Sequence, residues 1–166
     1  PGGHEIGLSV IGAPALWAMG YTGYGQLAFT NDTGVDPNVP AYATKYRGFY
    51  APTSAAFFNY DEDAQGQELN TEPFDCGYHG THVNGTILGL ERMTNDTIGV
   101  AFNAQWIGAS ILCGLGTEDN VAAFQWSLDP DGNPATSDDI PDIINNSWYD
   151  PSLDTLDCFS VYIPVS

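Results

Sequence analysis

Short strand-like stretches alternate with helical ones along the sequence. The strand-like stretches are residues 25–31, residues 104–112 and Ile143-Ile144, and the helical ones are residues 13–19, residues 79–91 and residues 119–128. Parallel neighbours in a sheet need a long crossover connection, which is usually a helix. The alternation therefore predicts an α/β fold with a mainly parallel sheet. Residues 36–75 show no clear periodicity and are expected to form a long irregular connection.

The first predicted strand ends at Asp32-Thr33-Gly34, which is a turn signal. Ligands of parallel α/β sheets bind beyond the carboxyl ends of the strands, so Asp32 is a candidate site residue. A half-buried carboxylate in a chain with few basic residues needs a hydrogen-bond donor, and an imidazole N–H is a suitable one. The alternative is an aspartate that only caps its own turn.

The chain is strongly acidic, because three basic residues stand against 21 acidic ones and give a formal net charge of −18. Such a chain repels phosphate backbones and anionic lipids, so neither nucleic acid nor a membrane is expected as a partner. With 43% hydrophobic residues, a chain of 166 residues is long enough for one domain with a sizeable core and short for two.

Acidic residues are dispersed along the chain except between residues 129 and 142. This stretch places oxygen ligands at alternate positions around Gly132, as calcium requires, although it lacks the closing Glu of an EF-hand. The candidate metal ligands are Asp129, Asp131, Asn133, Asp138 and Asp139. A solvated acidic turn that binds no ion is the alternative.

Cysteine and histidine recur at intervals of three residues in CGYHGTHVNGTILG, as Cys76, His79 and His82. A zinc site is one interpretation, but no fourth ligand is evident nearby and the metalloprotease pattern H-E-x-x-H is not matched. The other interpretation is a catalytic base beside a structural neighbour. His79 opens the predicted helix, where the positive end of the helix dipole disfavours a protonated ring and keeps it available as a base.

The cysteines are odd in number: Cys76, Cys113 and Cys158. In a secreted protein one of them would lack an internal partner and could pair outside this segment, and the sequence does not determine which. The chain begins with Pro1 rather than with Met, so we expect a processed product or a trimmed segment.

Four segments resemble, in the same order, segments of the subtilisin-like serine proteases, the subtilases. LAFTNDTGVDP resembles the segment of the family's aspartate, and HGTHVNGTI resembles its histidine segment, usually HGTHVAGT. IGVAFNAQWI is similar to the GVAPxA segment, and PDIINNSW is similar to the PDVVNNSW pattern of larger secreted bacterial members related to bacillopeptidase F. The resemblance implies the three-layer subtilisin-like fold and serine endopeptidase activity on peptides or proteins, with a secreted, bacterial origin.

The resemblance also implies roles for single residues. Asp32 would be the orienting acid and His79 the general base of an Asp-His-Ser triad, whose chain order is the one known for subtilisin. His82 would be a satisfied structural side chain. Gly80 and Gly85 would let the helix pack closely against a neighbouring backbone, and Asn84, where the family usually has Ala, has no expected consequence.

The same resemblance places the walls of a peptide-binding groove in two segments. These are Gly114-Leu115-Gly116 on one side and Ser147-Trp148-Tyr149 on the other. Main-chain pairing with both would hold a substrate extended. Tyr149 stands where the family commonly has Gly, so it is expected to crowd the groove.

No segment of the sequence resembles GTSMA, which carries the family's nucleophilic serine. Residues 1–166 are therefore interpreted as the N-terminal part of a single catalytic domain, inactive alone because the triad acts as a unit. The missing C-terminal half is expected as a partner, either as the second chain of a nicked protease or as the remainder of a truncated one. The alternative is a non-catalytic secreted fragment that binds calcium or another protein.

Overall fold

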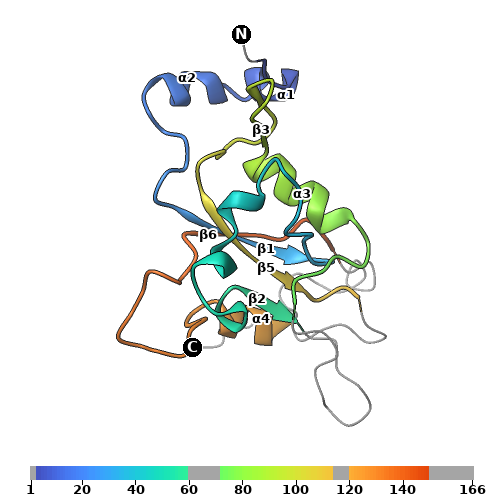
Figure 1. Cartoon of the computed structure of the whole chain (residues 1–166), viewed down its shortest axis with the longest axis vertical. Helices are drawn as coiled ribbons and strands as arrows, with labels where there is room; N and C mark the ends of the chain where they lie inside the picture. The colour runs from blue at the N-terminus through green and yellow to red at the C-terminus, as the bar shows by residue number, and fades with distance from the viewer. Residues whose placement is uncertain (1–2, 60–71, 114–119, 150–166) are drawn as a thin grey trace, which may run out of the picture.

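The computed structural model describes residues 3–59, 72–113 and 120–149 (Figure 1). Its α-helices are α1 (Ile6–Val10), α2 (Ala13–Ala18), α3 (His79–Leu88) and α4 (Asn120–Trp126). Its strands are β1 (Leu27–Asp32), β2 (Phe57–Asn59), β3 (Leu90–Glu91), β4 (Asp96–Thr97), β5 (Gln105–Ser110) and β6 (Ile143–Asn145). Short 3₁₀ helices at Ala43–Lys45, Arg47–Phe49 and Thr53–Ala55 precede β2. None of the described helices is long and apolar enough to cross a membrane.

The larger sheet is parallel and has the strand order β2-β5-β1-β6. Leu27 of β1 lies opposite Gln105 of β5, and Asp32 lies opposite Ser110, so the two strands end together. Every residue of β1 is buried, as expected for a parallel strand that is covered on both faces. The prediction of an α/β fold with a mainly parallel sheet is confirmed.

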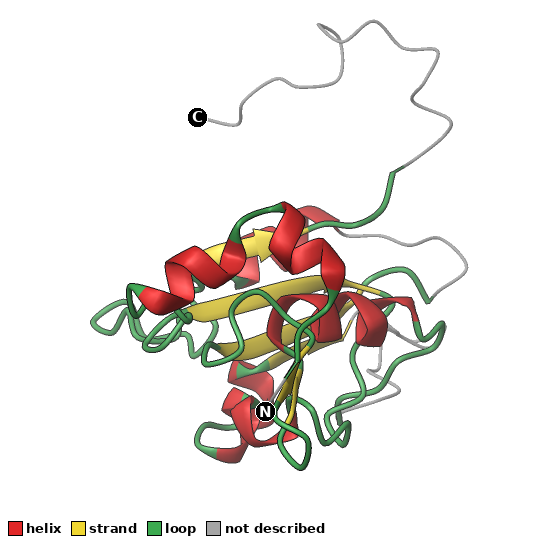
Figure 2. Ribbon diagram, turned by 90° about the horizontal axis from the view of Figure 1, so that it is seen from above, coloured by secondary structure: helices red, strands yellow, loops and turns green. Residues whose placement is uncertain are grey.

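Helices cover both faces of this sheet. The Thr30 hydroxyl of β1 donates a hydrogen bond to Asn84 Oδ1 of α3 at 3.0 Å, whereas Phe29 packs edge-on against Trp126 of α4. Successive side chains of a strand point to opposite faces, so α3 and α4 lie on opposite sides of β1. Figure 2 shows the strands between helical segments. Asn84, for which no consequence was expected, is fully buried and links α3 to β1.

Two predicted boundaries are corrected by the structure. The helix expected over residues 79–91 ends at Leu88, because Gly89 has an extended backbone and Leu90 pairs with Thr97 in the ribbon of β3 and β4. The connection over residues 36–75 is not irregular throughout, since it contains β2, which pairs with β5. This strand is short and its sequence has no alternating pattern. The extended conformation of β2 therefore depends on its pairing with β5 and could not be predicted from its local sequence.

A disulfide bond joins Cys76 and Cys113. It ties the segment that precedes α3 to the segment that follows β5, near the end of β1. Cys158 lies outside the described residues. The two cysteines that the structure describes are therefore paired with each other, and Cys76 is not available as a metal ligand.

Replacing both Cys76 and Cys113 with serine is expected to lower the free energy of unfolding by about 2–4 kcal/mol. The bond closes a loop with a sequence separation of 37, and opening it enlarges the set of unfolded conformations. The measurement is urea denaturation of the complete catalytic domain with and without a thiol reductant. Reductant should lower the unfolding midpoint of the unmodified protein and leave that of the double variant unchanged; an equal response of both proteins would contradict the prediction.

Candidate active site

The carboxylate of Asp32 and the imidazole of His79 are in direct contact. Asp32 ends β1 and is 0% exposed, and its Oδ1 accepts a hydrogen bond from His79 Nδ1–H at 2.8 Å. The Thr33 amide donates to the same oxygen at 2.7 Å, which holds the carboxylate in place. The His79 side chain is 52% exposed. Because a carboxylate only accepts, the ring carries its hydrogen on Nδ1 and keeps a lone pair on Nε2, where it can take a proton.

A glycine at position 80 allows α3 to begin against the end of β1. A Cβ atom on Gly80 would lie 2.0 Å from the carbonyl oxygen of Gly34 and 3.0 Å from the Cβ of Asp32. The Gly80 amide also donates to Thr33 Oγ1 at 3.0 Å, which bonds the first turn of α3 to the turn after β1. The same role was expected of Gly85, but a Cβ there would meet only Tyr42, at 4.0 Å, so that expectation is wrong.

Replacing Gly80 with alanine is expected to lower kcat/KM for peptide hydrolysis by about 100-fold, because the new methyl group must push His79 away from Asp32 by roughly 1 Å. Kinetics with a chromogenic peptide on the complete catalytic domain measure this change. Gly85→Ala is the matched control, because the same methyl group fits there and a helix-interior alanine stabilises by up to about 1 kcal/mol. Equal kinetics for the two variants would contradict the prediction.

Asp75 organises the start of α3, a role that its place in an apparently irregular segment did not reveal. Its Oδ1 accepts hydrogen bonds from the Thr33 hydroxyl and from the amides of Gly77 and Tyr78, and its Oδ2 accepts one from the Thr81 amide. Burial raises the pKa of Asp75, but the hydrogen bonds, foremost those from Thr81 and Thr33, outweigh it and hold the pKa below its usual value. The sequence did offer one signal for this role, because an aspartate shortly before a predicted helix is typical of a residue that caps the helix start.

Replacing Asp75 with asparagine is expected to lower the free energy of unfolding by about 1–2 kcal/mol at neutral pH, because an amide nitrogen takes the place of one acceptor oxygen. The folded pKa of Asp75 is depressed, so the carboxylate's contribution is complete above the unfolded value of about 3.9 and is lost as the pH falls through the folded value. Unfolding curves recorded from neutral to acidic pH should therefore converge for the two proteins. A difference that stays constant down to the lowest pH would count against this role.

Comparison with known proteins identifies the family to which this site belongs. The family model Peptidase_S8, the subtilase family, matches residues 30–156, which include both Asp32 and His79. The chain belongs to the subtilase family. The resemblance predicted from the sequence motifs is thereby confirmed.

Three relatives show how far the likeness extends. This subtilase chain is 38% identical to bacillopeptidase F of Bacillus subtilis (strain 168) over 155 residues, which are 88% of this chain and 10% of that protein. It is 35% identical to furin of Homo sapiens over 116 residues, which are 70% of this chain and 14% of furin. It is 29% identical to subtilisin E of Bacillus subtilis (strain 168) over 150 residues, which are 90% of this chain and 33% of subtilisin E. The chain thus spans between a tenth and a third of the length of these relatives.

A solved structure shares the fold of this subtilase. The match is to a protease from Pseudoalteromonas arctica PAMC 21717, with a TM-score of 0.60 and 22% sequence identity. It covers 82% of this chain and 44% of that one. The subtilisin-like fold expected from the motifs is therefore confirmed.

The other members of the histidine segment do not form a metal site in this subtilase. His82, expected to be a satisfied structural side chain, is exposed, and its ring has no hydrogen-bond partner among the described residues. Cys76 is in a disulfide bond, and His79 turns its Nδ1 toward Asp32. The zinc interpretation is therefore wrong.

Of the two segments expected to form the groove walls, the structure describes Ser147-Trp148-Tyr149, which follows β6 at the edge of the sheet where Asp32 lies. Because β5 and β6 run parallel to β1, the residues that follow each of them start from the edge where β1 ends. The indole N–H of Trp148 donates to the carbonyl oxygen of Asn31 at 2.9 Å, and the Tyr149 side chain is exposed. Gly114, Leu115 and Gly116 lie outside the described residues. For Ser147-Trp148-Tyr149 a role in substrate binding stays a prediction.

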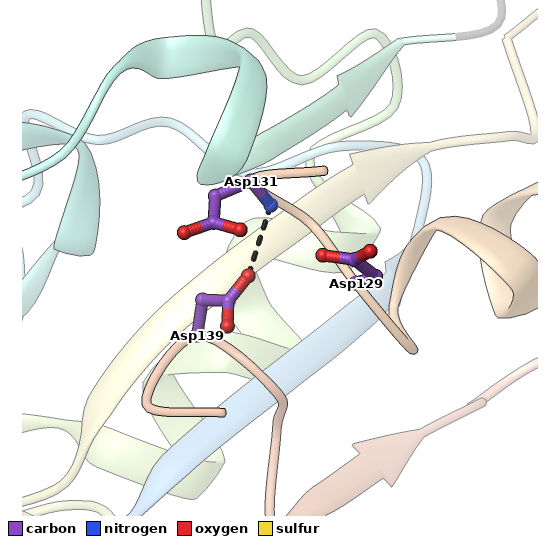
Figure 3. A group of neighbouring side chains, drawn as sticks. All are labelled: Asp129, Asp131 and Asp139. Carbon is purple, nitrogen blue, oxygen red and sulfur yellow. Dashed lines mark hydrogen bonds between the residues drawn. The ribbon is translucent and has the colours of Figure 1, made fainter. Parts of the chain in front are cut away.

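The structure brings together only part of the predicted metal-ligand set. One carboxylate oxygen from each of Asp129, Asp131 and Asp139 lies within 4.8 Å of the other two (Figure 3). Asp138 forms a salt bridge to Arg47 at 2.7 Å instead. Asn133 Oδ1 accepts a hydrogen bond from the amide of Ala135, within the loop itself.

Proposed function

We propose that this chain supplies the acid and the base of a subtilisin-like serine endopeptidase that acts on peptides or proteins. The observation that carries the proposal is the 2.8 Å hydrogen bond from His79 to the buried carboxylate of Asp32, in a chain of the subtilase family. The pair lies at the carboxyl edge of a parallel sheet, which is the usual place for a ligand in such folds.

In this mechanism His79 Nε2 takes the proton of a serine hydroxyl while that oxygen attacks the scissile carbonyl, and it then returns the proton to the leaving amine. Asp32 keeps the ring in the Nδ1–H tautomer and stabilises the imidazolium that forms. The Asp32 carboxylate is fully buried, so little solvent screens its charge from the ring.

The serine comes from outside these 166 residues, none of which lies in a segment that resembles GTSMA. We infer that the chain is the N-terminal part of a single catalytic domain. The remaining part, in the same polypeptide or in a second one, provides the serine and the oxyanion donor. Without that part the chain does not hydrolyse peptides, because the triad members act as a unit.

The substrate lies extended between residues 114–116 and residues 147–149 and pairs with their main chain, as an added strand does in β-augmentation. The exposed ring of Tyr149 contacts it at this edge. We also place the protein outside a bacterial cell, where the disulfide bond between Cys76 and Cys113 persists in oxidising surroundings.

A fluorophosphonate probe tests the proposal, because it labels only a serine that a neighbouring base activates. The complete catalytic domain should be labelled and should cleave a peptide substrate, whereas the 166-residue chain alone should do neither. Labelling of the isolated chain would refute the assignment of the serine to another segment. A complete domain that resists labelling and cleaves nothing would refute the peptidase proposal as a whole.

A further inference from the structure

Among the described residues, two side-chain hydrogen bonds join α3 to β1, and one of them is the contact between His79 and Asp32. The other is donated by the Thr30 hydroxyl to Asn84 Oδ1 at 3.0 Å, and both of its partners are 0% exposed. Thr30 and Asp32 are two positions apart on the strand, so their side chains point to the same face of the sheet. The pair of Asp32 and His79 therefore has a second polar contact behind it, made by the same strand and the same helix.

The spacing of the two contacts is the same along the strand and along the helix. Thr30 and Asp32 are two residues apart, which corresponds to about 7 Å in a strand. Asn84 follows His79 by five residues, which corresponds to about 7.5 Å in an α-helix. The helix runs back along the strand, because its first residue meets the last residue of β1. Two contacts with equal spacing fix both the position and the tilt of α3 along β1, whereas one contact fixes a single point.

Other hydrogen bonds act at the two ends of α3. At its start the Gly80 amide donates to Thr33, in the turn that follows β1. In its last turn two carbonyl oxygens accept hydrogen bonds from the amides of residues 100–101, which lie outside the sheet. The middle of the helix is bonded to the strand that carries Asp32 through Asn84.

Thr30 and Asn84 depend on each other. A buried hydroxyl without a partner is costly, so a threonine at position 30 needs a partner on the facing helix. The usual family segment HGTHVAGT has alanine where this chain has Asn84, and an alanine side chain offers no acceptor. Asn84 Nδ2 is itself buried without a hydrogen-bond partner among the described residues, so the asparagine carries a cost of its own. Stability alone does not explain a buried polar pair at a contact where an apolar residue is usual, and such departures are expected at functional sites.

We propose that Asn84 is a positioning residue for His79. The hydrogen bond that it accepts from Thr30 fixes α3 along β1, and this keeps His79 Nδ1 at hydrogen-bond distance from the Asp32 carboxylate. The inference rests on the proposed peptidase function and adds a residue that acts through the helix of the general base. A displacement of about 1 Å can lower a catalytic rate about 100-fold, so a smaller shift of His79 lowers kcat by less and leaves substrate binding unchanged.

Kinetics with a chromogenic peptide on the complete catalytic domain test the proposal at a temperature at which every variant is folded. Asn84→Ala and Thr30→Val each remove one partner of the bond and should each lower kcat by about tenfold with KM unchanged. The variant with both substitutions should be no slower than either single one, because the same bond is lost. Thr30→Ser keeps the hydroxyl and should retain kcat within a factor of about three. The matched control is Thr86→Ala, at an exposed residue of α3 whose hydroxyl donates to the His82 carbonyl within the helix, and it should also retain kcat.

Unfolding midpoints separate positioning from stability. Each single variant leaves a buried polar group without a partner and should unfold at a lower temperature than the unmodified protein. The double variant has apolar groups in place of both and should regain most of this loss, whereas its kcat should stay about tenfold low. Recovery of kcat together with the midpoint would overturn the proposal, and so would an unchanged kcat in both single variants. Should Asn84→Ala fail to fold, Thr30→Val tests the same bond.

Proton NMR of the complete domain provides a measurement that does not use peptidase activity. The resonance of the hydrogen on His79 Nδ1 reports its bond to Asp32, and it should shift or broaden in Asn84→Ala and stay unchanged in Thr86→Ala. If the complete domain hydrolyses no peptide, the peptidase proposal fails and this resonance still decides whether Asn84 positions the ring. If the domain is active and Asn84→Ala keeps both the resonance and kcat, only the positioning role fails.

Discussion

Replacing His79 with alanine is expected to lower kcat for peptide hydrolysis by the complete catalytic domain by about 10⁶-fold, which is the magnitude known for subtilisin itself. The reason is the loss of the atom that takes the serine proton. KM should change little, because the half-exposed ring of His79 contributes proton transfer rather than substrate contact area. Steady-state kinetics with a chromogenic peptide measure both constants, and circular dichroism checks that the fold is retained.

The matched control for this substitution is His82→Ala, on the same helix. The His82 ring is exposed and has no hydrogen-bond partner among the described residues, so its removal should leave kcat within a factor of about three. Fluorophosphonate labelling should follow the kinetics, lost for His79→Ala and retained for His82→Ala. Comparable losses in both variants would mean that the two histidines have not been assigned to the right roles.

The predictable part of the site consists of residues at the boundaries of strongly patterned elements. Asp32 could be placed because a run of buried residues ends there in a turn signal, and the structure puts it at the last position of β1. His79 could be placed because small and apolar residues at helical spacing begin with it, and α3 starts there. Local patterns suffice when each functional residue sits where an element starts or stops.

The unpredicted part depends on contacts between segments distant in sequence. Asp75 bonds the start of α3 from a segment without periodicity, and its partner Thr33 lies 42 residues away. The pairing of Cys76 with Cys113 rather than Cys158 follows from the way β1 and β5 end together. A regular spacing does not show which carboxylates of a loop lie together: Asp138 forms a salt bridge with Arg47, whereas its neighbour Asp139 is buried and accepts a hydrogen bond from the Asp131 amide.

Replacing Asp32 with alanine is expected to lower kcat by about 10⁴-fold, again the magnitude known for subtilisin. The structure adds a distinction between the two contributions of this carboxylate, orientation and charge. Asp32 Oδ1 accepts from both His79 and the Thr33 amide, so the oxygen of an asparagine side chain can take the same position and keep the ring in the Nδ1–H tautomer. Asp32→Asn then loses the charge and places an amide NH₂ group where Oδ2 is buried without a hydrogen-bond partner among the described residues.

The asparagine variant should therefore exceed the alanine variant in kcat by about tenfold, because it retains a hydrogen bond worth about 1.5 kcal/mol at a buried site. Asp36→Asn is the control, since Asp36 is exposed and its carboxylate accepts only from the local Asn38 among the described residues. If the asparagine and alanine variants were equally slow, orientation of the ring by Asp32 would contribute nothing, and the charge of the carboxylate would account for the whole effect. A ratio of about tenfold or more separates the two contributions, because both variants lack the charge and only one of them can hold the ring.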